Sequence, residues 1–223
     1  MDAMPFEDAR ARLASAIAAR PPRRLEVDGL RPASVLVPVL ARPGGAALLF
    51  TRRTELVPRH KGEISFPGGA REPGEDAVEA ALREAHEEVG LPPDRVEVLG
   101  AIDDLPSITG FVVTPVIGVV AAPPAAFVPQ AFEVLEPFEI PLARLLAPGV
   151  RRAEWWPAAR LPPEVEAPLR AARAHVEDYD EAGGRYRVWL FDAAPDRVVW
   201  GLTGRILASV LDRAFGAAAV TPG

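Results

Sequence analysis

Apolar residues recur at helical spacing in three parts of this chain. The first part covers 6–20 and ends before a Pro-Pro pair. The second covers 75–89, where an acidic first turn suits the positive end of a helix dipole and Gly90 is a stop signal. The third covers 202–215, close to the carboxyl end. Each pattern predicts a helix that buries one face.

Shorter apolar segments predict β-strands at 34–40, 46–51, 96–102, 111–120 and 186–191. The turn sequence at 42–45 joins the first two into a hairpin, and Pro38 favours an edge position for the first strand. Proline is frequent in 121–185, so we expect an irregular segment with a strand at 138–140 and a short helix at 142–146. Strands and helices in this order predict one α/β domain with a mixed sheet between helical layers, closed by the strand and helix of 186–215.

Composition narrows the class of protein. A chain of 223 residues with 49% hydrophobic and 25% charged side chains fits a single globular domain. It has no cysteine, so a metal ion must bind to oxygen or imidazole. The net charge of −6 argues against a nucleic-acid partner, although a local basic patch for a small anion is compatible with it. No apolar stretch is long enough to cross a membrane and the amino end lacks a signal-peptide pattern, so we expect a cytoplasmic protein without a membrane partner. The oligomeric state stays open.

Three carboxylates gather on the helix predicted at 75–89. Glu84, Glu87 and Glu88 fall within an arc of about 100° on a helical wheel. Like charges at this spacing repel, and the sequence offers no compensating charge toward the helix end, so a bound divalent cation would remove the cost. Oxygen ligands of this kind favour Mg²⁺ or Mn²⁺. Arg83 follows Glu79 by four residues and is interpreted as a structural ion-pair partner.

The segment 69–91 matches the pattern Gly-x5-Glu-x7-Arg-Glu-apolar-x-Glu-Glu-x-Gly-apolar at every position, and so resembles the Nudix box. The resemblance implies an α/β/α sandwich and a Mg²⁺- or Mn²⁺-dependent enzyme that hydrolyses a nucleoside diphosphate linked to another group. It also implies that Glu84, Glu87 and Glu88 ligate metal or handle the proton of the attacking water, with the backbone carbonyl of Gly69 as a further ligand. The identity of the general base stays open.

A later segment, 133–146, resembles the strand-to-helix part of Nudix domains in which a glutamate contributes to metal binding or catalysis. Glu133 is the candidate there, and a solvated loop glutamate is the alternative. Near the carboxyl end, Trp200-Gly-Leu-Thr-Gly-Arg resembles a closing segment of the same family. Trp155 and Trp156 fit either a hydrophobic anchor under a loop or a stack on adenine.

Residues before the box resemble the coenzyme A pyrophosphatase branch of the Nudix family. Thr51, Arg53, Gly62 and the Phe-Pro-Gly-Gly of 66–69 fit its signature, whereas Pro58 occupies an arginine position. The candidates for binding the anionic substrate are Arg52, Arg53, Arg59 and His60.

The resemblance implies that the small-molecule substrate is coenzyme A or a related nucleotide. Two alternatives stay open. In the first, the same chemistry acts on ADP-ribose, a dinucleoside polyphosphate or a nucleoside triphosphate. In the second, the domain senses a nucleotide without hydrolysing it.

Overall fold

The structure, a computed structural model, describes residues 3–54, 63–157, 179–180, 184–216 and 221–222. Its centre is a mixed sheet with the strand order β3-β2-β1-β7-β5. The long strands are β1 (Arg31–Arg42), β2 (Gly45–Arg53), β5 (Glu97–Ala101) and β7 (Phe111–Val120). The pair β1–β7 is parallel, whereas β2 and β5 run antiparallel to their neighbours. The path begins at β3 (Ile64–Ser65), which pairs with β2. Three further strands lie off this path: β8 (Val134–Pro141) pairs with β2, β4 (Gly68–Ala70) pairs with β1, and β6 (Leu105–Pro106) pairs with β7.

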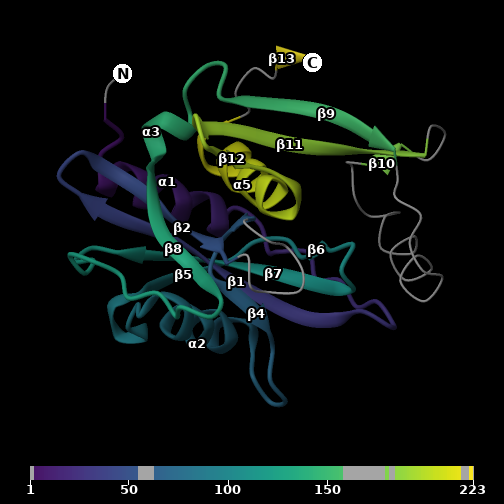
Figure 1. The fold of residues 1–223 in the computed structure, drawn as a ribbon, viewed down its shortest axis with the longest axis horizontal. Coiled ribbons are helices and arrows are strands. Elements are labelled where there is room, and N and C mark those ends of the chain that lie inside the picture. Colours follow the sequence, from purple (N-terminus) through teal and green to yellow (C-terminus); the bar gives the residue numbers. More distant parts are fainter. Residues whose placement is uncertain (1–2, 55–62, 158–178, 181–183, 217–220, 223) are drawn as a thin grey trace.

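Helices cover both faces of the central sheet (Figure 1). Helix α2 (Ala77–Val89) lies on one face, and α1 (Phe6–Ala18) and α5 (Gly201–Phe215) lie on the other. Strand β1 shows why both faces are apolar: Leu36 and Leu40 join the core under α2, whereas Val37 and Val39 join the core under α1 and α5. Alternate residues of a strand point to opposite faces, so a near-continuous apolar run is needed here.

A second sheet packs over α5 and carries the carboxyl-terminal part of the chain (Figure 1). Its order is β10-β11-β9-β13, with β12 paired to β11. The bounds are β9 (Arg151–Pro157), β10 (Tyr179–Asp180), β11 (Arg185–Ala194), β12 (Arg197–Val199) and β13 (Thr221–Pro222). Two short helical turns complete the described fold: the 3-10 turn η1 (Pro93–Arg95) and α3 (Leu142–Leu145).

Most sequence-based elements are confirmed, and two expectations are wrong. Pro38 lies in the central strand β1, not at an edge. Pro38 pairs with Gly118 of β7, but its nitrogen points to the other side of β1, the side to which the Leu36 N–H donates. On that side the β2 partners begin at Val39 and the β4 partners end at Val35, so no ladder there needs an N–H at position 38. The segment 121–185 is also less irregular than expected, since it contains all of β8 and β9. The strand β9 escaped detection because its partner, β11, is distant in sequence.

The contact between α5 and the second sheet depends on one glycine. A Cβ atom at Gly204 would overlap the backbone oxygen of Trp189 in β11. Glycine-to-alanine changes inside a helix normally stabilise a protein. Gly204→Ala is expected to do the opposite and to lower the free energy of unfolding by about 1–3 kcal/mol, measured by urea denaturation.

The matched control is Gly44→Ala, in the turn between β1 and β2, where a Cβ atom would meet nothing within 4 Å. This control is expected to change stability by less than about 0.5 kcal/mol. A Gly204→Ala protein as stable as the control would contradict the packing described for α5.

Candidate functional site

The helix α2 is fixed at both ends by local hydrogen bonds. At its start the Asp76 carboxylate accepts bonds from the backbone N–H groups of Val78 and Glu79, at 2.7 and 2.9 Å. The Glu79 carboxylate in turn accepts a bond from the backbone N–H of Asp76 at 2.9 Å, which completes a capping box. At its end Gly90 adopts a left-handed conformation with φ of 67°. The two caps set where the helix begins and ends.

The buried stripe of α2 decides where its carboxylates lie. Ala81, Ala85 and Val89 pack against the central sheet. Glu88 projects beside this stripe and is itself only 4% exposed. A carboxylate is therefore held at the border of the apolar core, which is an unusual position for a charge.

Glu88 lies against the strand β4. Its Oε2 atom accepts a hydrogen bond from the backbone N–H of Gly68 at 3.3 Å. Burial raises the pKa of Glu88 to about 8, the nearby charge of Arg53 opposes this rise, and the charges of Glu84 and Glu133 add to it. The buried carboxylate is thus surrounded by both signs of charge, with the negative side in excess.

Glu84 lies one turn before Glu88 in the helix, and its carboxylate packs against Gly69 of β4. A Cβ atom at position 69 would come within 2.5 Å of the Glu84 Oε1 atom, so the absence of a side chain there makes room for the carboxylate. Burial raises the pKa of Glu84, a hydrogen bond from Arg83 lowers it, and Glu133 adds to the rise. Glu84 and Glu88 therefore face the same strand and influence each other.

Arg83 connects an acidic residue between the end of β4 and the start of α2 with two acidic residues of the helix. Its Nε and Nη2 atoms donate to the two carboxylate oxygens of Glu75 at 2.7 and 3.0 Å. Its Nη1 atom donates to Glu84 at 2.9 Å and to Glu87 at 3.1 Å. A further bond from Nη2 reaches the carbonyl of Ala70 in β4 at 3.1 Å. Every hydrogen-bonding edge of this guanidinium is used, so it fixes the loop, the strand and the helix relative to one another.

Two sequence-based inferences about this cluster are corrected. Arg83 is a structural ion-pair partner, as expected, but it pairs with Glu75 and Glu84 rather than with Glu79. Glu79 belongs to the capping box. The carboxylates also have a compensating charge, because Arg83 bonds to both Glu84 and Glu87. Glu87 is 54% exposed and lies farther out than Glu84 at 15%. Glu84 and Glu88 are therefore largely buried near β4, whereas Glu87 is exposed.

Glu133 and Arg53 come from other segments of the chain and lie near the carboxylates of α2. The backbone N–H of Thr54 donates to the Glu133 carbonyl at 3.1 Å, and that of Gln130 donates to the Glu88 carbonyl at 3.0 Å. These bonds join the end of β2, the segment before β8 and the end of α2. The structure thus brings Glu133 and Arg53 into electrostatic range of Glu88, although they are far from it in sequence.

The remaining candidates for substrate binding divide into two groups. Arg52 lies on the strand next to Arg53 but faces β8, where its Nη1 atom is 4.0 Å from the carboxylate of Glu136. Arg59 and His60 lie outside the described residues. Of these four candidates, the structure places Arg53 beside the carboxylates.

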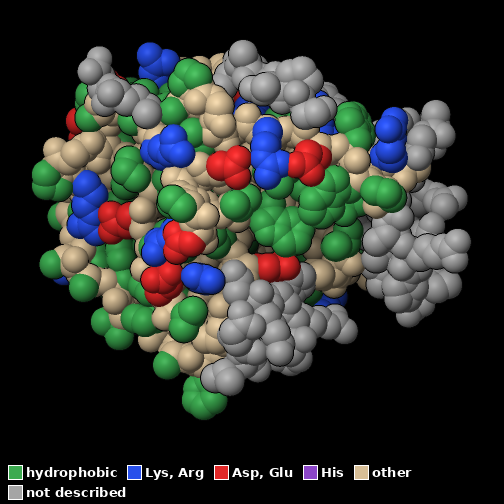
Figure 2. Space-filling model, turned by 45° about the horizontal axis from the view of Figure 1, so that its top comes forward, with side chains coloured by type: hydrophobic (Ala, Val, Ile, Leu, Met, Phe, Trp, Pro, Cys, Tyr) green, Lys and Arg blue, Asp and Glu red, His purple; other side chains and the backbone are tan. Residues whose placement is uncertain are grey.

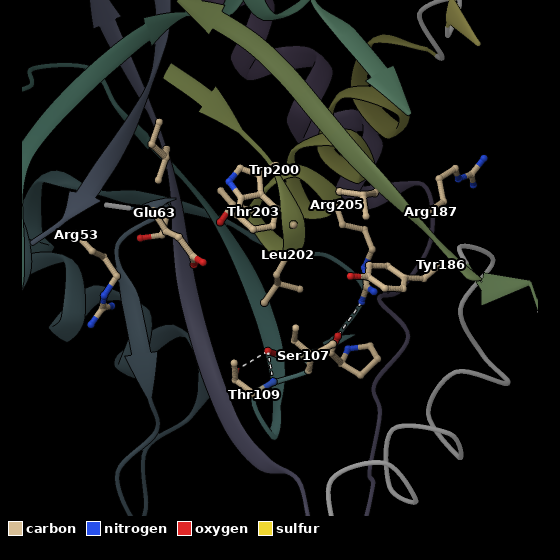
Figure 3. A pocket seen from close by; sticks show the side chains of 16 residues that line it. Arg53, Glu63, Ser107, Thr109, Tyr186, Arg187, Trp200, Leu202, Thr203 and Arg205 are labelled. Carbon is tan, nitrogen blue, oxygen red and sulfur yellow. Dashed lines mark hydrogen bonds between the residues drawn. The ribbon is translucent and has the colours of Figure 1, made fainter. Parts of the chain in front are cut away.

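A cavity of about 280 Å³ opens next to Arg53, between the central sheet and the second sheet (Figure 3). Its lining comes from the ends of β2 and β3, the turn between β6 and β7, the strand β11 and the start of α5. Figure 3 shows Arg53 and Glu63 on one side of this space and Tyr186 on the other. The cavity and the carboxylate cluster therefore meet at Arg53.

The outer surface is mixed in charge. On the face shown in Figure 2, acidic and basic side chains are interspersed with apolar ones, and no continuous basic field forms on the part that is coloured. Among the described residues, no helix has the length and apolar character needed to span a membrane.

Comparison with known proteins identifies the family. Residues 30–177 match the NUDIX domain. A protein from Pectobacterium atrosepticum described as an uncharacterized Nudix hydrolase, NudL, is 37% identical over 188 residues, which is 84% of each chain. The chain belongs to the Nudix family. A NudL protein from Klebsiella pneumoniae is 38% identical over 179 residues, or 79% of each chain. Among solved structures, the Nudix hydrolase RenU of M. smegmatis is 27% identical with a TM-score of 0.44, over 69% of this chain and 91% of that chain.

As a Nudix hydrolase the protein acts on phosphoanhydride bonds, and enzymes of this family generally use divalent ions such as Mg²⁺ or Mn²⁺. Within the described residues, no group of three or more His, Cys, Asp or Glu side chains is arranged as a ready metal site. The donors nevertheless suit such an ion: the carboxylates are oxygen ligands, and Glu88 is a buried acid with a neighbouring acid, Glu84. A cation beside Glu84 and Glu88 would offset the repulsion and burial that raise the pKa of each.

Two features of the Nudix site were missed in the sequence. The sequence pattern places Glu75 in an acidic first turn and in the box but gives it no role, whereas in the structure it is the bidentate partner of Arg83. Its fixed place in the Nudix box was the available signal. The wall of the cavity formed by β11 and α5 had no local signal, because the tertiary fold alone brings Tyr186 close to Arg53.

The contact between Gly69 and Glu84 gives a direct test of the site. Gly69→Ala is expected to leave the fold intact, because the atom it meets is the mobile end of a side chain, but to displace the Glu84 carboxylate. We expect the concentration of Mg²⁺ for half-maximal activity to rise on the order of tenfold.

Metal titrations of Gly69→Ala and of the control Gly44→Ala check this expectation, with circular dichroism to compare the folds. An unchanged metal requirement in Gly69→Ala would show that Glu84 does not act at this position.

Proposed function

We propose that this Nudix hydrolase cleaves the pyrophosphate bond of coenzyme A and its derivatives, giving 3′,5′-ADP and 4′-phosphopantetheine or its acylated form. The observation that carries the proposal is the position of Arg53, between the buried Glu88 and a cavity that can receive another part of a substrate. Arg53 also belongs to the segment that resembles the coenzyme A branch. A cation at this point suits the diphosphate of the substrate.

The residues around the diphosphate have separate tasks in this proposal. Glu84, Glu88 and the Gly69 carbonyl would hold the divalent ion, with Glu87 as an outer contributor. When bound, Mg²⁺ or Mn²⁺ supplies positive charge that neutralises phosphoryl oxygens in the transition state. Arg83 keeps Glu84 in place through their 2.9 Å hydrogen bond. Glu133 contributes a further carboxylate that can hold metal or accept the proton of the attacking water.

The reaction adds water across one P–O–P linkage. The water oxygen forms a bond to one phosphorus atom, and the bond from that phosphorus to the bridging oxygen breaks. One proton of the water is removed by a carboxylate of the cluster, and the other remains on the new phosphate product. This chemistry needs no covalent intermediate on the protein and is in line with a site built from carboxylates and arginine. We propose that it takes place in the cytoplasm.

The substrate is tested by comparing four compounds under one set of conditions: coenzyme A, ADP-ribose, a dinucleoside polyphosphate and a nucleoside triphosphate. With Mn²⁺ or Mg²⁺ we expect the highest kcat/KM for coenzyme A, with 3′,5′-ADP and 4′-phosphopantetheine identified by mass spectrometry. A higher kcat/KM for any of the other three would assign the enzyme to that substrate instead. Nucleotide binding without any product would favour a sensor.

The role of Glu88 is tested by an isosteric change. Glu88→Gln keeps the side-chain volume but removes the charge, and kcat is expected to fall on the order of 100-fold or more at saturating Mg²⁺. The matched control is Glu79→Gln on the same helix, because glutamine preserves a capping box. If Glu88→Gln folds normally and keeps full activity, the proposed metal site is wrong.

A further inference from the structure

The cavity beside Arg53 has two walls from different parts of the chain (Figure 3). The first wall comes from the central sheet and includes Ile64, Pro106, Ser107, Ile108 and Thr109. The second wall comes from β11 and the start of α5 and includes Tyr186, Val188, Trp200, Leu202 and Thr203. The match to the NUDIX domain ends at residue 177, so the second wall is an addition to the matched region. The carboxylates lie within the residues that match the family, whereas this wall lies in the carboxyl-terminal part of the chain beyond them.

The second wall offers flat aromatic surfaces together with hydroxyl groups. The Trp200 side chain is 40% exposed, and its ring lies 5.8 Å from that of Trp156, which supports it from the side. In Figure 3, Trp200 and Tyr186 border the same space, and Leu202 points into it from α5. Aromatic faces bind planar rings by stacking, and nearby hydroxyls can bond to the polar edge of such a ring. This combination suits a nucleobase.

Hydrogen bonds tie the two walls of the cavity together. The Arg205 Nη2 atom donates to the Pro106 carbonyl at 3.1 Å and so links α5 to β6 across the cavity. The turn between β6 and β7 is held by bonds from the Ser107 N–H to the Phe111 carbonyl at 2.8 Å and from the Gly110 N–H to the Ser107 carbonyl at 3.2 Å. A preformed pocket loses little entropy when it binds, which favours a rigid ring over a flexible chain.

The size and position of the cavity restrict which part of a substrate it can hold. At about 280 Å³ it lies just below the usual range for small-molecule sites, so it fits one ring system rather than a whole dinucleotide-like substrate. Arg53 lines the cavity and also acts electrostatically on Glu88. A ligand that fills the cavity would therefore extend its next charged group toward Arg53 and the carboxylates.

We propose that this cavity binds the nucleobase of the substrate, stacked on Trp200, so that the attached diphosphate crosses Arg53 to reach Glu84 and Glu88. The assignment deepens the proposed function and rests on it for the position of the diphosphate. It makes Trp200 a specificity-determining residue and the carboxyl-terminal strand and helix the part that selects nucleotides. The other half of coenzyme A, the flexible pantetheine arm, lies outside this cavity.

The proposal is tested by calorimetric binding to the full chain in EDTA, where no hydrolysis can occur. The probes are adenosine 5′-monophosphate, ribose 5-phosphate and pantetheine. The wild-type protein is expected to bind the adenine nucleotide more tightly than ribose 5-phosphate. Trp200→Ala is expected to lower the affinity for adenosine 5′-monophosphate on the order of tenfold, and Trp200→Phe is expected to retain most of the wild-type affinity.

The matched control is Trp155→Ala, because Trp155 is 46% exposed in β9 of the second sheet and does not line the cavity. A second variant, Ile108→Trp, fills the space from the opposite wall at a side chain that is 49% exposed, so it blocks the nucleotide without removing a contact on α5. Equal nucleotide affinity in the wild type and Trp200→Ala would overturn the proposal. The proposal would also be overturned if the wild type did not bind the nucleotide at millimolar concentration. Binding of pantetheine that is lost in Trp200→Ala would overturn it as well.

The two proposals can fail separately. If coenzyme A is not cleaved but adenine nucleotide binding depends on Trp200, the proposed substrate is wrong and the assignment of the cavity stands. If coenzyme A is cleaved and Trp200→Ala leaves both its KM and nucleotide binding unchanged, the substrate stands and the cavity assignment is wrong.

Discussion

The arrangement depends on one buried carboxylate, that of Glu88, held at the edge of the apolar core. Removing a charge from water is costly, and here burial dominates the rise of the Glu88 pKa. The position is possible because Gly68 lets β4 approach β1: a Cβ atom at this glycine would overlap the Ser34 carbonyl. The close strand then presents a backbone N–H to the carboxylate at 3.3 Å. A group that is destabilised in this way gains more from a divalent cation than an exposed acid would.

The second constraint is the guanidinium of Arg83. It lowers the pKa of Glu75 to about 2 through a bidentate hydrogen bond and also bonds to Glu84 and Glu87. Its charge offsets part of the repulsion between the acids in adjacent turns of the helix. It also divides them, because Glu87 is held at the exposed side while Glu84 and Glu88 face β4. The acidic stripe inferred from the sequence is thus an inner pair with an outer neighbour.

The sequence was sufficient where local rules decide the structure. The helix α2 was predictable from its apolar spacing, and the box motif located Glu84, Glu88 and the glycine turn beside them. What failed were relations between distant segments: the strand β9 is defined by its pairing with β11, and Pro38 is tolerated only because two short ladders leave a gap. The same limit applies to the site. Glu133 could be proposed by resemblance, but its approach to Glu88 depends on hydrogen bonds between three separate segments.

The central claim, that the inner carboxylates hold a divalent ion against β4, is tested most directly by paramagnetic relaxation with Mn²⁺. In amide NMR spectra of the full chain, substoichiometric Mn²⁺ should broaden the signals of Gly68, Gly69 and Glu88 before any others in the assigned spectrum. Broadening that begins instead at exposed acidic residues such as Glu72 or Glu97, with the Gly68 and Gly69 signals unaffected, would contradict the account.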